Sequence, residues 1–280
     1  MYDNLSIKCI FASPFFKMKS LLNSVIIISL IAVSGCSGYE KILKNPDISV
    51  KYAKAIEYYG KKDYVRAGTL LEMVNPFYRG SKRADTINFY YAQCLYHQSD
   101  YIMAGHYFKE FTQTFPRSHF VEEADYMVAY CYYINSPRPT LDQESTLQAI
   151  DAVQLFMIKY PQSNRIEESK KYFTELRERL MTKSYLNAKL YFDLGYYKSS
   201  IIALRNGLSE FPDSKYREEM MLLVVKSNYY LAEKSIESKQ KERYQNTLDE
   251  YYSFMTEFPK SKYSSDVQKI YKNLADYLNL

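Results

Sequence analysis

The side chains that could do chemistry in this sequence are thiols, imidazoles and carboxylates, and their spacing favours no active site. Cys94 and His97 form half of a metal-binding pair, and nothing else in the chain supplies clear remaining ligands. We interpret all three histidines as surface or groove residues; they are His97, His106 and His119. Three acid pairs each follow a turn closely, which predicts carboxylates in the first turn of a helix, where the helix dipole stabilises them. These pairs are Glu122-Glu123, Glu167-Glu168 and Glu218-Glu219.

Catalytic sequence motifs are missing as well. We find no Gly-rich phosphate loop, nucleophile elbow or metalloprotease helix. We therefore expect a protein that is not an enzyme, with no catalytic residues, no metal and no cofactor. Without residues 1–35 the chain has 34 basic and 31 acidic residues, a net charge of +3. This balance argues against nucleic acid as a partner, which would favour a basic stripe.

Cys36 is the residue for which the sequence predicts a modification. Met18-Lys19 precedes an apolar stretch from Leu21 to Val33, which ends in Val33-Ser34-Gly35-Cys36. A basic start, a short apolar core and small residues at the cut indicate a secretory signal, too short to span a membrane. The ending resembles the bacterial lipobox, in which the cysteine becomes the lipidated first residue.

The ordered ending disfavours the other interpretation, an ordinary apolar helix with a chance cysteine. Residues 1–17 fit no signal, so Met18 is a candidate for the true start. We predict a signal peptide at 1–35 and a lipidated tether at 36–46. Acyl chains on Cys36 would hold the protein at a membrane almost permanently, because each buried methylene contributes roughly 0.8 kcal/mol.

The rest of the chain repeats itself. Asp63-Tyr64 with Ala67 recurs 37 residues later as Asp100-Tyr101 with Ala104. A period in the thirties with small residues at fixed helical positions is typical of stacked helix pairs, because one pair cannot bury its apolar face alone. Later intervals of 45, 51 and 47 residues between the small positions indicate insertions.

A second repeated pattern marks the ends of the predicted helices. An aromatic residue, a proline and a serine recur together, and they predict a helix stop followed by a cap. The four copies are Phe115-Pro116-Arg117-Ser118, Tyr160-Pro161-Gln162-Ser163, Phe211-Pro212-Asp213-Ser214 and Phe258-Pro259-Lys260-Ser261. An uninterrupted helical pattern also runs from Ile166 to about Leu194.

These signals predict an all-α fold, an α-solenoid of about five tetratricopeptide-like helix pairs plus a C-terminal capping helix. The repeat domain is expected at 47–280. Its units lie at approximately 47–80, 81–118, 119–163, 164–214 and 215–262, with the cap at 263–280.

The first helices of the units carry a candidate binding strip. Register and helical spacing place six side chains on one face of two neighbouring helices: Tyr52, Ile56, Tyr59, Phe89, Gln93 and Tyr96. Tyr126, Tyr130 and Tyr133 continue the strip in the third unit. Tyrosine offers apolar contact plus a hydroxyl, which suits an extended peptide. Packing between helices is the competing interpretation of these aromatic residues.

Two cysteines occupy equivalent positions in neighbouring units, Cys94 and Cys131. Neighbouring helices lie about 8–10 Å apart, further than a disulfide usually allows between alpha carbons. We therefore predict two buried free thiols.

At this point the chain resembles a known family. The lipobox, the tetratricopeptide-like units, the loop from Ser136-Pro137 to Asp142-Gln143 with Thr146, and the passage from Leu176 to Ser214 are together similar to the BamD family. These are lipoproteins of the machinery that assembles outer-membrane β-barrels. The resemblance spans nearly the whole mature chain.

The resemblance implies an assembly factor lipid-anchored, through chains such as palmitate, at the periplasmic face of the outer membrane. Its N-terminal units would bind the C-terminal signals of unfolded β-barrel precursors, which places the strip at the substrate end. Its C-terminal units would dock on the barrel-forming assembly subunit, beside other assembly lipoproteins. One docking arginine of the family has no counterpart, since Ala203 stands at that position and Arg205 lies two residues on.

Two other functions remain open. A lipoprotein of this kind could be an adaptor that organises cell-wall or envelope enzymes. It could also bind glycans, although sugar-binding surfaces generally use tryptophan and this chain has none.

Overall fold

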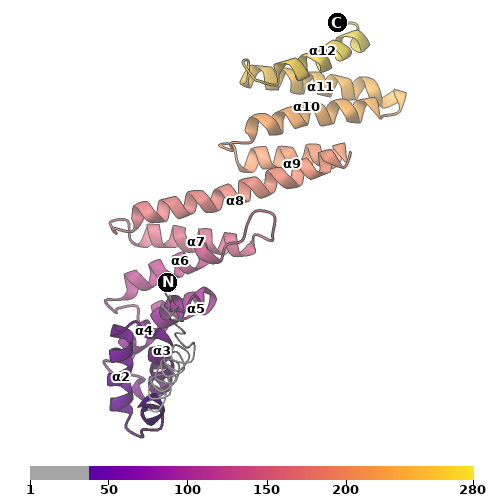
Figure 1. Ribbon diagram of the computed structural model, residues 1–280. Helices are drawn as coiled ribbons and strands as arrows, with labels where there is room; N and C mark the ends of the chain where they lie inside the picture. The colour runs from indigo at the N-terminus through magenta and orange to yellow at the C-terminus, as the bar shows by residue number, and fades with distance from the viewer. Residues whose placement is uncertain (1–37) are drawn as a thin grey trace, which may run out of the picture. The chain divides into compact units, whose positions relative to one another are not determined.

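The computed structural model describes residues 38–280, and every regular element in that range is a helix. These residues fall into two compact units, 38–99 and 100–280. The first unit contains α2 (Ile48–Gly60), α3 (Tyr64–Val74), the 3-10 helix η1 (Asn75–Tyr78) and α4 (Ala84–His97). The second contains α5 (Tyr101–Thr114), α6 (Val121–Asn135), α7 (Glu144–Lys159), α8 (Ile166–Asp193), α9 (Tyr197–Glu210), α10 (Arg217–Glu233), α11 (Glu237–Glu257) and α12 (Ser264–Leu278) (Figure 1).

The aromatic-proline signals end helices as predicted. α5, α7, α9 and α11 each stop one residue before the aromatic residue, because the proline that follows has no N–H to continue the ladder. The serines, however, are not N-caps. Each accepts a hydrogen bond from the backbone N–H two residues on and so forms the turn just before the next helix begins, as Ser118 does with Phe120 at 3.3 Å and Ser261 with Tyr263 at 2.9 Å.

The first unit packs around an apolar cluster contributed by α2, α3 and α4, with Ala55, Leu70, Leu71 and Ile87 fully buried. Small residues allow the helices to approach closely, since a Cβ added to Gly68 would lie 3.3 Å from the Cβ of Cys94. Ala67, the predicted small position of the repeat, is the residue before Gly68 and is fully buried.

The predicted tether is shorter than we expected. Residues 38–43 are helical, and Tyr39, Ile42 and Leu43 pack against the first unit's cluster. The spacing of these three apolar residues gives the short helix one apolar face, which packs on the first unit. The signal peptide and Cys36 lie outside the described residues.

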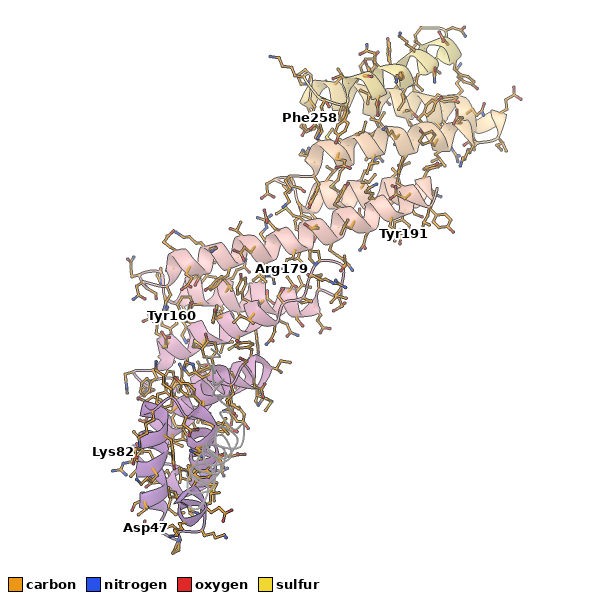
Figure 2. All side chains as sticks on the ribbon, viewed as in Figure 1. Asp47, Lys82, Tyr160, Arg179, Tyr191 and Phe258 are labelled. Atoms are coloured by element: carbon orange, nitrogen blue, oxygen red, sulfur yellow. The ribbon has the colours of Figure 1, made fainter. Side chains whose placement is uncertain are left out.

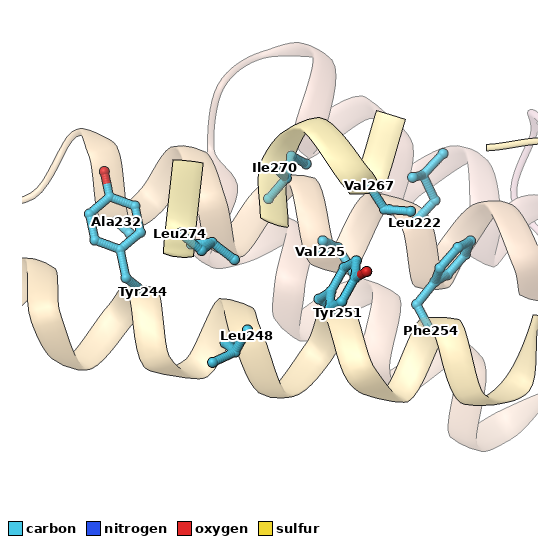
Figure 3. Close-up of a cluster of buried hydrophobic side chains, with 10 residues drawn as sticks. All are labelled: Leu222, Val225, Ala232, Tyr244, Leu248, Tyr251, Phe254, Val267, Ile270 and Leu274. Carbon is cyan, nitrogen blue, oxygen red and sulfur yellow. The ribbon is translucent and has the colours of Figure 1, made fainter. Parts of the chain in front are cut away.

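In the second unit each helix packs on the helices before and after it in the chain. α8 begins at the predicted Ile166 and ends one residue before Leu194, and it is long enough to pack on α7 near its start and on α9 further along (Figure 1). α12 covers the last pair. Ten buried side chains of α10, α11 and α12 form the core of this end (Figure 3). The predicted all-α fold of stacked helix pairs is confirmed; the boundaries of the five repeat units stay a prediction.

The loop from Ser136-Pro137 to Asp142-Gln143 lies between α6 and α7, and side chains hold it in place. Gln143 donates from its amide to the carbonyls of Arg138 and Leu141, at 2.9 and 3.0 Å. From α8, Arg179 donates to the Ser136 carbonyl at 3.0 Å and Lys183 to the Leu141 carbonyl at 3.1 Å. The loop is therefore a fixed part of the second unit.

Candidate peptide-binding surface

The candidate strip lies on α2 and α4, which belong to the same compact unit. α2 starts at Ile48 because the Asp47 side chain accepts a hydrogen bond from the Ser49 N–H at 2.8 Å and caps the helix. Five of the six strip residues are half-buried, namely Tyr52, Ile56, Tyr59, Gln93 and Tyr96. Phe89 is only 5% exposed, so its ring offers almost no surface to a ligand.

Tyr52 lies at one end of the strip and contacts residues before α4. Its ring centroid is 5.5 Å from that of Tyr78, and the Arg83 guanidinium carbon lies 5.0 Å from the centroid. A cation at this distance is attracted by the ring face. Tyr52 thus has a packing role, and only the remaining edge of the ring is open.

Tyr59 lies at the other end of the α2 strip. Its ring contacts Tyr90 at 4.5 Å and Tyr64 at 5.6 Å between centroids. Burial, helped by the neighbouring Cys94, raises the pKa of Tyr59 to about 12. The hydroxyl therefore stays protonated at neutral pH and can donate a hydrogen bond to a carboxylate or carbonyl.

His97 lies next to Tyr96 at the end of the strip. The His97 ring stacks on Tyr64, 4.0 Å between centroids with 12° between planes, and meets the Tyr96 ring edge-on at 5.2 Å. Burial, with a smaller contribution from the positive charge of Lys62, lowers the pKa of His97. The imidazole is therefore neutral at pH 7. All three histidines are exposed, as predicted.

The third-unit tyrosines have a different environment from the one the sequence predicted. Tyr126 is 4% exposed, and its hydroxyl donates to Glu168 Oε2 at 2.8 Å and lies 3.3 Å from the Tyr172 hydroxyl. Tyr133 donates to Glu175 and stacks on Tyr172, 4.2 Å between centroids. These hydroxyls join α6 to α8. The packing interpretation is correct for Tyr126 and Tyr133, because α8 brings carboxylates and rings against them.

Sequence analysis missed the arginines that cover two of the tyrosines. Arg83 lies over Tyr52, and Arg165 lies over Tyr126 with its guanidinium carbon 4.5 Å from the ring centroid. Each arginine is the last residue before the next first helix, α4 or α8. An arginine directly before the next first helix was the available signal.

Cys94 and Cys131 are buried free thiols, as predicted. Burial raises the pKa of each thiol to about 12. Neither residue is nucleophilic at neutral pH. Within residues 38–280, no group of three or more His, Cys, Asp or Glu side chains could hold a metal ion.

Comparison with known proteins decides the family. Residues 45–244 match the family YfiO, described as outer membrane lipoproteins, and this range includes all six strip residues. The chain belongs to this family. The predicted resemblance to BamD lipoproteins is thereby confirmed. The family's description is of a lipoprotein and names no enzymatic activity.

A curated relative agrees with this assignment. The chain is 24% identical over 236 residues to a protein of Aquifex aeolicus (strain VF5) described as outer membrane protein assembly factor BamD, with 82% of this chain and 75% of the relative covered. Among solved structures, the tetratricopeptide-like repeats of a kinesin light chain from Podospora anserina match 76% of this chain and 97% of that chain. The identity there is 12% and the TM-score 0.32, too distant a likeness to carry an argument.

Because the chain belongs to a lipoprotein family, the question is how its amino end attaches to a membrane. No helix between residues 38 and 280 combines the length and the apolarity needed to cross a membrane. Cys36 lies outside both the described residues and the matched range, so its lipidation stays a prediction.

Proposed function

We propose that this lipoprotein is an outer membrane protein assembly factor. Acyl chains on Cys36 anchor it at the periplasmic face of the outer membrane. Its first compact unit binds the C-terminal signals of unfolded β-barrel precursors, and its later helix pairs dock on the barrel-forming assembly subunit, beside other assembly lipoproteins.

The family match over residues 45–244 is the observation that carries this proposal. The relative in Aquifex aeolicus is described as an assembly factor, and the alignment with it spans 82% of this chain. A shared role is the simplest reason for a likeness of this extent between helical-repeat proteins.

The strip has chemistry that fits an extended peptide. Ile56 and Gln93 occupy the centre of the strip and are half-buried, so an apolar side chain and an amide are partly open to a ligand. The Tyr59 hydroxyl beside them stays protonated. Together they can contact alternate apolar side chains of a strand and donate to its carboxylate end.

Titration of a peptide from the C-terminus of a barrel precursor tests the strip. The double variant Ile56→Ala and Gln93→Ala removes the open groups and leaves the tyrosine packing intact. We expect affinity to fall by about fivefold or more, since a contact residue at the centre of an interface contributes over about 1 kcal/mol. Leu155→Ala, a change at an exposed residue of α7, is the control and should bind as the unchanged protein does.

Equal affinity of the double variant and the unchanged protein, with equal melting temperatures, would remove the strip from the proposal. Tyr59→Phe then separates packing from hydrogen bonding. It keeps the contacts with Tyr64 and Tyr90 and removes only the hydroxyl, so a weaker complex would assign the hydroxyl a direct role.

Fractionation of cells that produce Cys36→Ser tests the anchor. The unchanged protein should sediment with the outer membrane, and the variant should be released in soluble form. A variant that still sediments after a high-salt wash would contradict anchoring through this cysteine.

Copurification from native membranes tests the docking function. Recovery of a barrel-forming subunit supports it, whereas recovery of cell-wall enzymes alone favours the adaptor function. Arg205 is not a free substitute for the family's docking arginine, because it pairs with Glu250 of α11. We therefore expect Arg205→Ala to leave the recovered complex unchanged.

A further inference from the structure

Tyr39, the second described residue, is half-buried and packs against the first unit. The Tyr39 ring meets Tyr58 edge-on at 5.7 Å between centroids, and the Arg66 guanidinium carbon lies 5.3 Å from the Tyr39 centroid. The Tyr39 hydroxyl also lies 3.5 Å from the Arg66 carbonyl oxygen, to which it donates. Tyr39 is thereby held against the turn that joins α2 to α3.

Only Ser37 and Gly38 separate Cys36 from Tyr39, so Tyr39 is three residues further along the chain. Three residues span at most about 11 Å when fully extended. If Cys36 carries acyl chains, as the proposed function requires, the membrane surface lies within about that distance of the Tyr39 backbone. The protein surface next to Tyr39 is then close enough to contact lipid headgroups.

This surface carries positive charge that acidic residues do not neutralise. Three nearby cations have partners: Lys61 pairs with Glu57 at 2.7 Å, Arg66 with Asp63 at 3.0 Å and Lys44 with Glu40 at 3.7 Å. Lys41 and Lys62 are exposed and have no carboxylate within 4 Å among residues 38–280. Val65, the second residue of α3, is 61% exposed.

Lys62 is held in a backbone conformation that costs stability. Its φ is 61°, in the left-handed region, where the Cβ of an L-residue is strained. The turn between α8 and α9 has the same pattern of backbone hydrogen bonds: Lys62 N–H donates to the Tyr59 carbonyl at 2.9 Å, as Gly195 N–H does to Phe192 at 2.9 Å. Gly195 has φ 77° and avoids the strain. Ser99 repeats the conformation 37 residues after Lys62, with φ 64° and its N–H donating to the Tyr96 carbonyl at 2.9 Å. The strain therefore belongs to the turn itself, and Lys62 adds an exposed positive charge to it.

We propose that Lys41, Lys62 and Val65 form a membrane-contact surface that binds anionic phospholipid headgroups in the leaflet that holds the acyl chains. The ammonium groups contact the headgroup phosphates, and the valine side chain enters the interface between headgroups and acyl chains. The contact fixes the orientation of the first unit on the membrane, which a flexible anchor alone would leave free.

The test uses the lipidated protein bound to vesicles. An environment-sensitive fluorophore is attached at Val65→Cys, and labelling is selective because burial raises the pKa of the Cys94 and Cys131 thiols to about 12. Phe77→Cys is the matched control, because Phe77 is 69% exposed and lies beyond the other end of α3, about 18 Å away along the helix axis. We expect a blue shift and weaker acrylamide quenching at position 65 only.

Vesicles with and without phosphatidylglycerol isolate the charge contribution. The shift at position 65 should be larger with phosphatidylglycerol and should shrink at high salt, since the Debye length falls from about 30 Å at 0.01 M to about 3 Å at 1 M. Lys62→Gly, in the labelled protein, should lose most of the phosphatidylglycerol-dependent shift without loss of folding, because glycine suits this turn. Lys62→Arg, which keeps the positive charge, should retain the phosphatidylglycerol-dependent shift.

The outcomes separate this inference from the proposed function. Failure of the lipidated protein to attach to vesicles overturns the anchor, and this inference with it. If the protein attaches but the fluorophore emits as in water at both positions, this inference alone is overturned. Equal emission shifts at positions 65 and 77 overturn it as well.

Discussion

The Tyr126 hydroxyl donates a hydrogen bond to the Glu168 carboxylate at 2.8 Å, although 42 residues separate the two side chains. The same carboxylate accepts a second hydrogen bond from Tyr172 at 2.5 Å. Tyr126 is on α6 and Glu168 is in the first turn of α8. The carboxylate therefore connects the first helices of two neighbouring units, with α7 between them in the chain. The first-turn acid that sequence analysis assigned to the helix dipole thus also joins neighbouring repeats.

Removing the Tyr126 hydroxyl should weaken the second unit. Tyr126→Phe keeps the ring and deletes the hydrogen bond, and we expect the free energy of unfolding to fall by about 1–2 kcal/mol because the partner is charged and the site is buried. Urea denaturation measures the change. Tyr191→Phe is the control, since Tyr191 is 42% exposed and its hydroxyl has no hydrogen bond among the described residues (Figure 2).

Stability should fall in acid through the same carboxylates. Hydrogen bonds from Tyr172 and Tyr126 hold the pKa of Glu168 below its ordinary value of 4.5, and Arg217 does the same for the pKa of Glu257. The folded state therefore binds fewer protons than the unfolded state at these sites. Their contribution is complete above the ordinary carboxyl pKa and is lost as the pH falls through the lowered values.

We expect a melting temperature that is level above about pH 5 and decreases below about pH 4.5. Glu168→Gln should melt at a lower temperature at neutral pH and lose less on acidification than the unchanged protein. Glu167→Gln serves as control, because Glu167 is on the same turn but pairs with Lys170 at 2.6 Å and accepts no tyrosine hydrogen bond among the described residues. Identical slopes for the Glu168 variant and the unchanged protein would contradict this assignment.

Gly207 should not tolerate a side chain. A Cβ added at this position of α9 would lie 2.6 Å from Met220 Cε and 2.6 Å from Ser184 Oγ, and Met220 is fully buried. We expect Gly207→Ala to destabilise the protein by about 1–3 kcal/mol through overpacking. Gly60→Ala has nothing within 4 Å of the new atom and should be neutral or stabilising by up to about 1 kcal/mol. A similar effect of both changes would show that packing at α9 is looser than described.

Lys62 and Gly195 both lie in the left-handed region and make opposite predictions. Lys62→Gly should stabilise the first unit by about 0.5–1 kcal/mol, because relief of strain exceeds the extra entropy of glycine in the unfolded chain. Gly195→Ala should destabilise the second unit by about 1 kcal/mol, since it introduces the same strain. Differential scanning calorimetry measures both. A loss of stability in the Lys62 variant would mean that its side chain makes a stabilising contact.

The native thiols should be inert. Because burial raises the pKa of Cys94 and Cys131 to about 12, we expect no reaction of either with a thiol reagent at pH 8 in the folded mature protein. Both should react once urea unfolds the chain. Fast labelling before unfolding would indicate that one of the two units opens locally at low free energy.

Local signals explain why so much of the helical pattern could be predicted. Proline lacks an N–H, so the stops before Phe115 and Phe211 follow from the sequence alone. The start of α8 at Ile166 follows from a turn and an apolar period. These features depend on residues within one or two turns of each other, which is what a sequence displays directly.

The direction of the strip tyrosines could not be predicted in the same way. Tyr52 and Tyr126 share a register position and an arginine over the ring, yet only Tyr126 meets a carboxylate from the next first helix. The difference depends on which residues α8 presents, more than 40 positions away. Periodicity shows that a face is apolar but does not show which residue will cover it.

For this protein, the sequence by itself determined the helices, the residues at which they stop and the family resemblance, and it predicted the signal before Cys36, because each of these depends on residues that are close together along the chain. Only the tertiary structure decided that Tyr39 is fixed in the first core, that Phe89 and Tyr126 are buried and that Lys62 occupies a strained turn. Those features depend on contacts between segments far apart in the sequence, and the energy of such contacts is set by packing and charge in three dimensions.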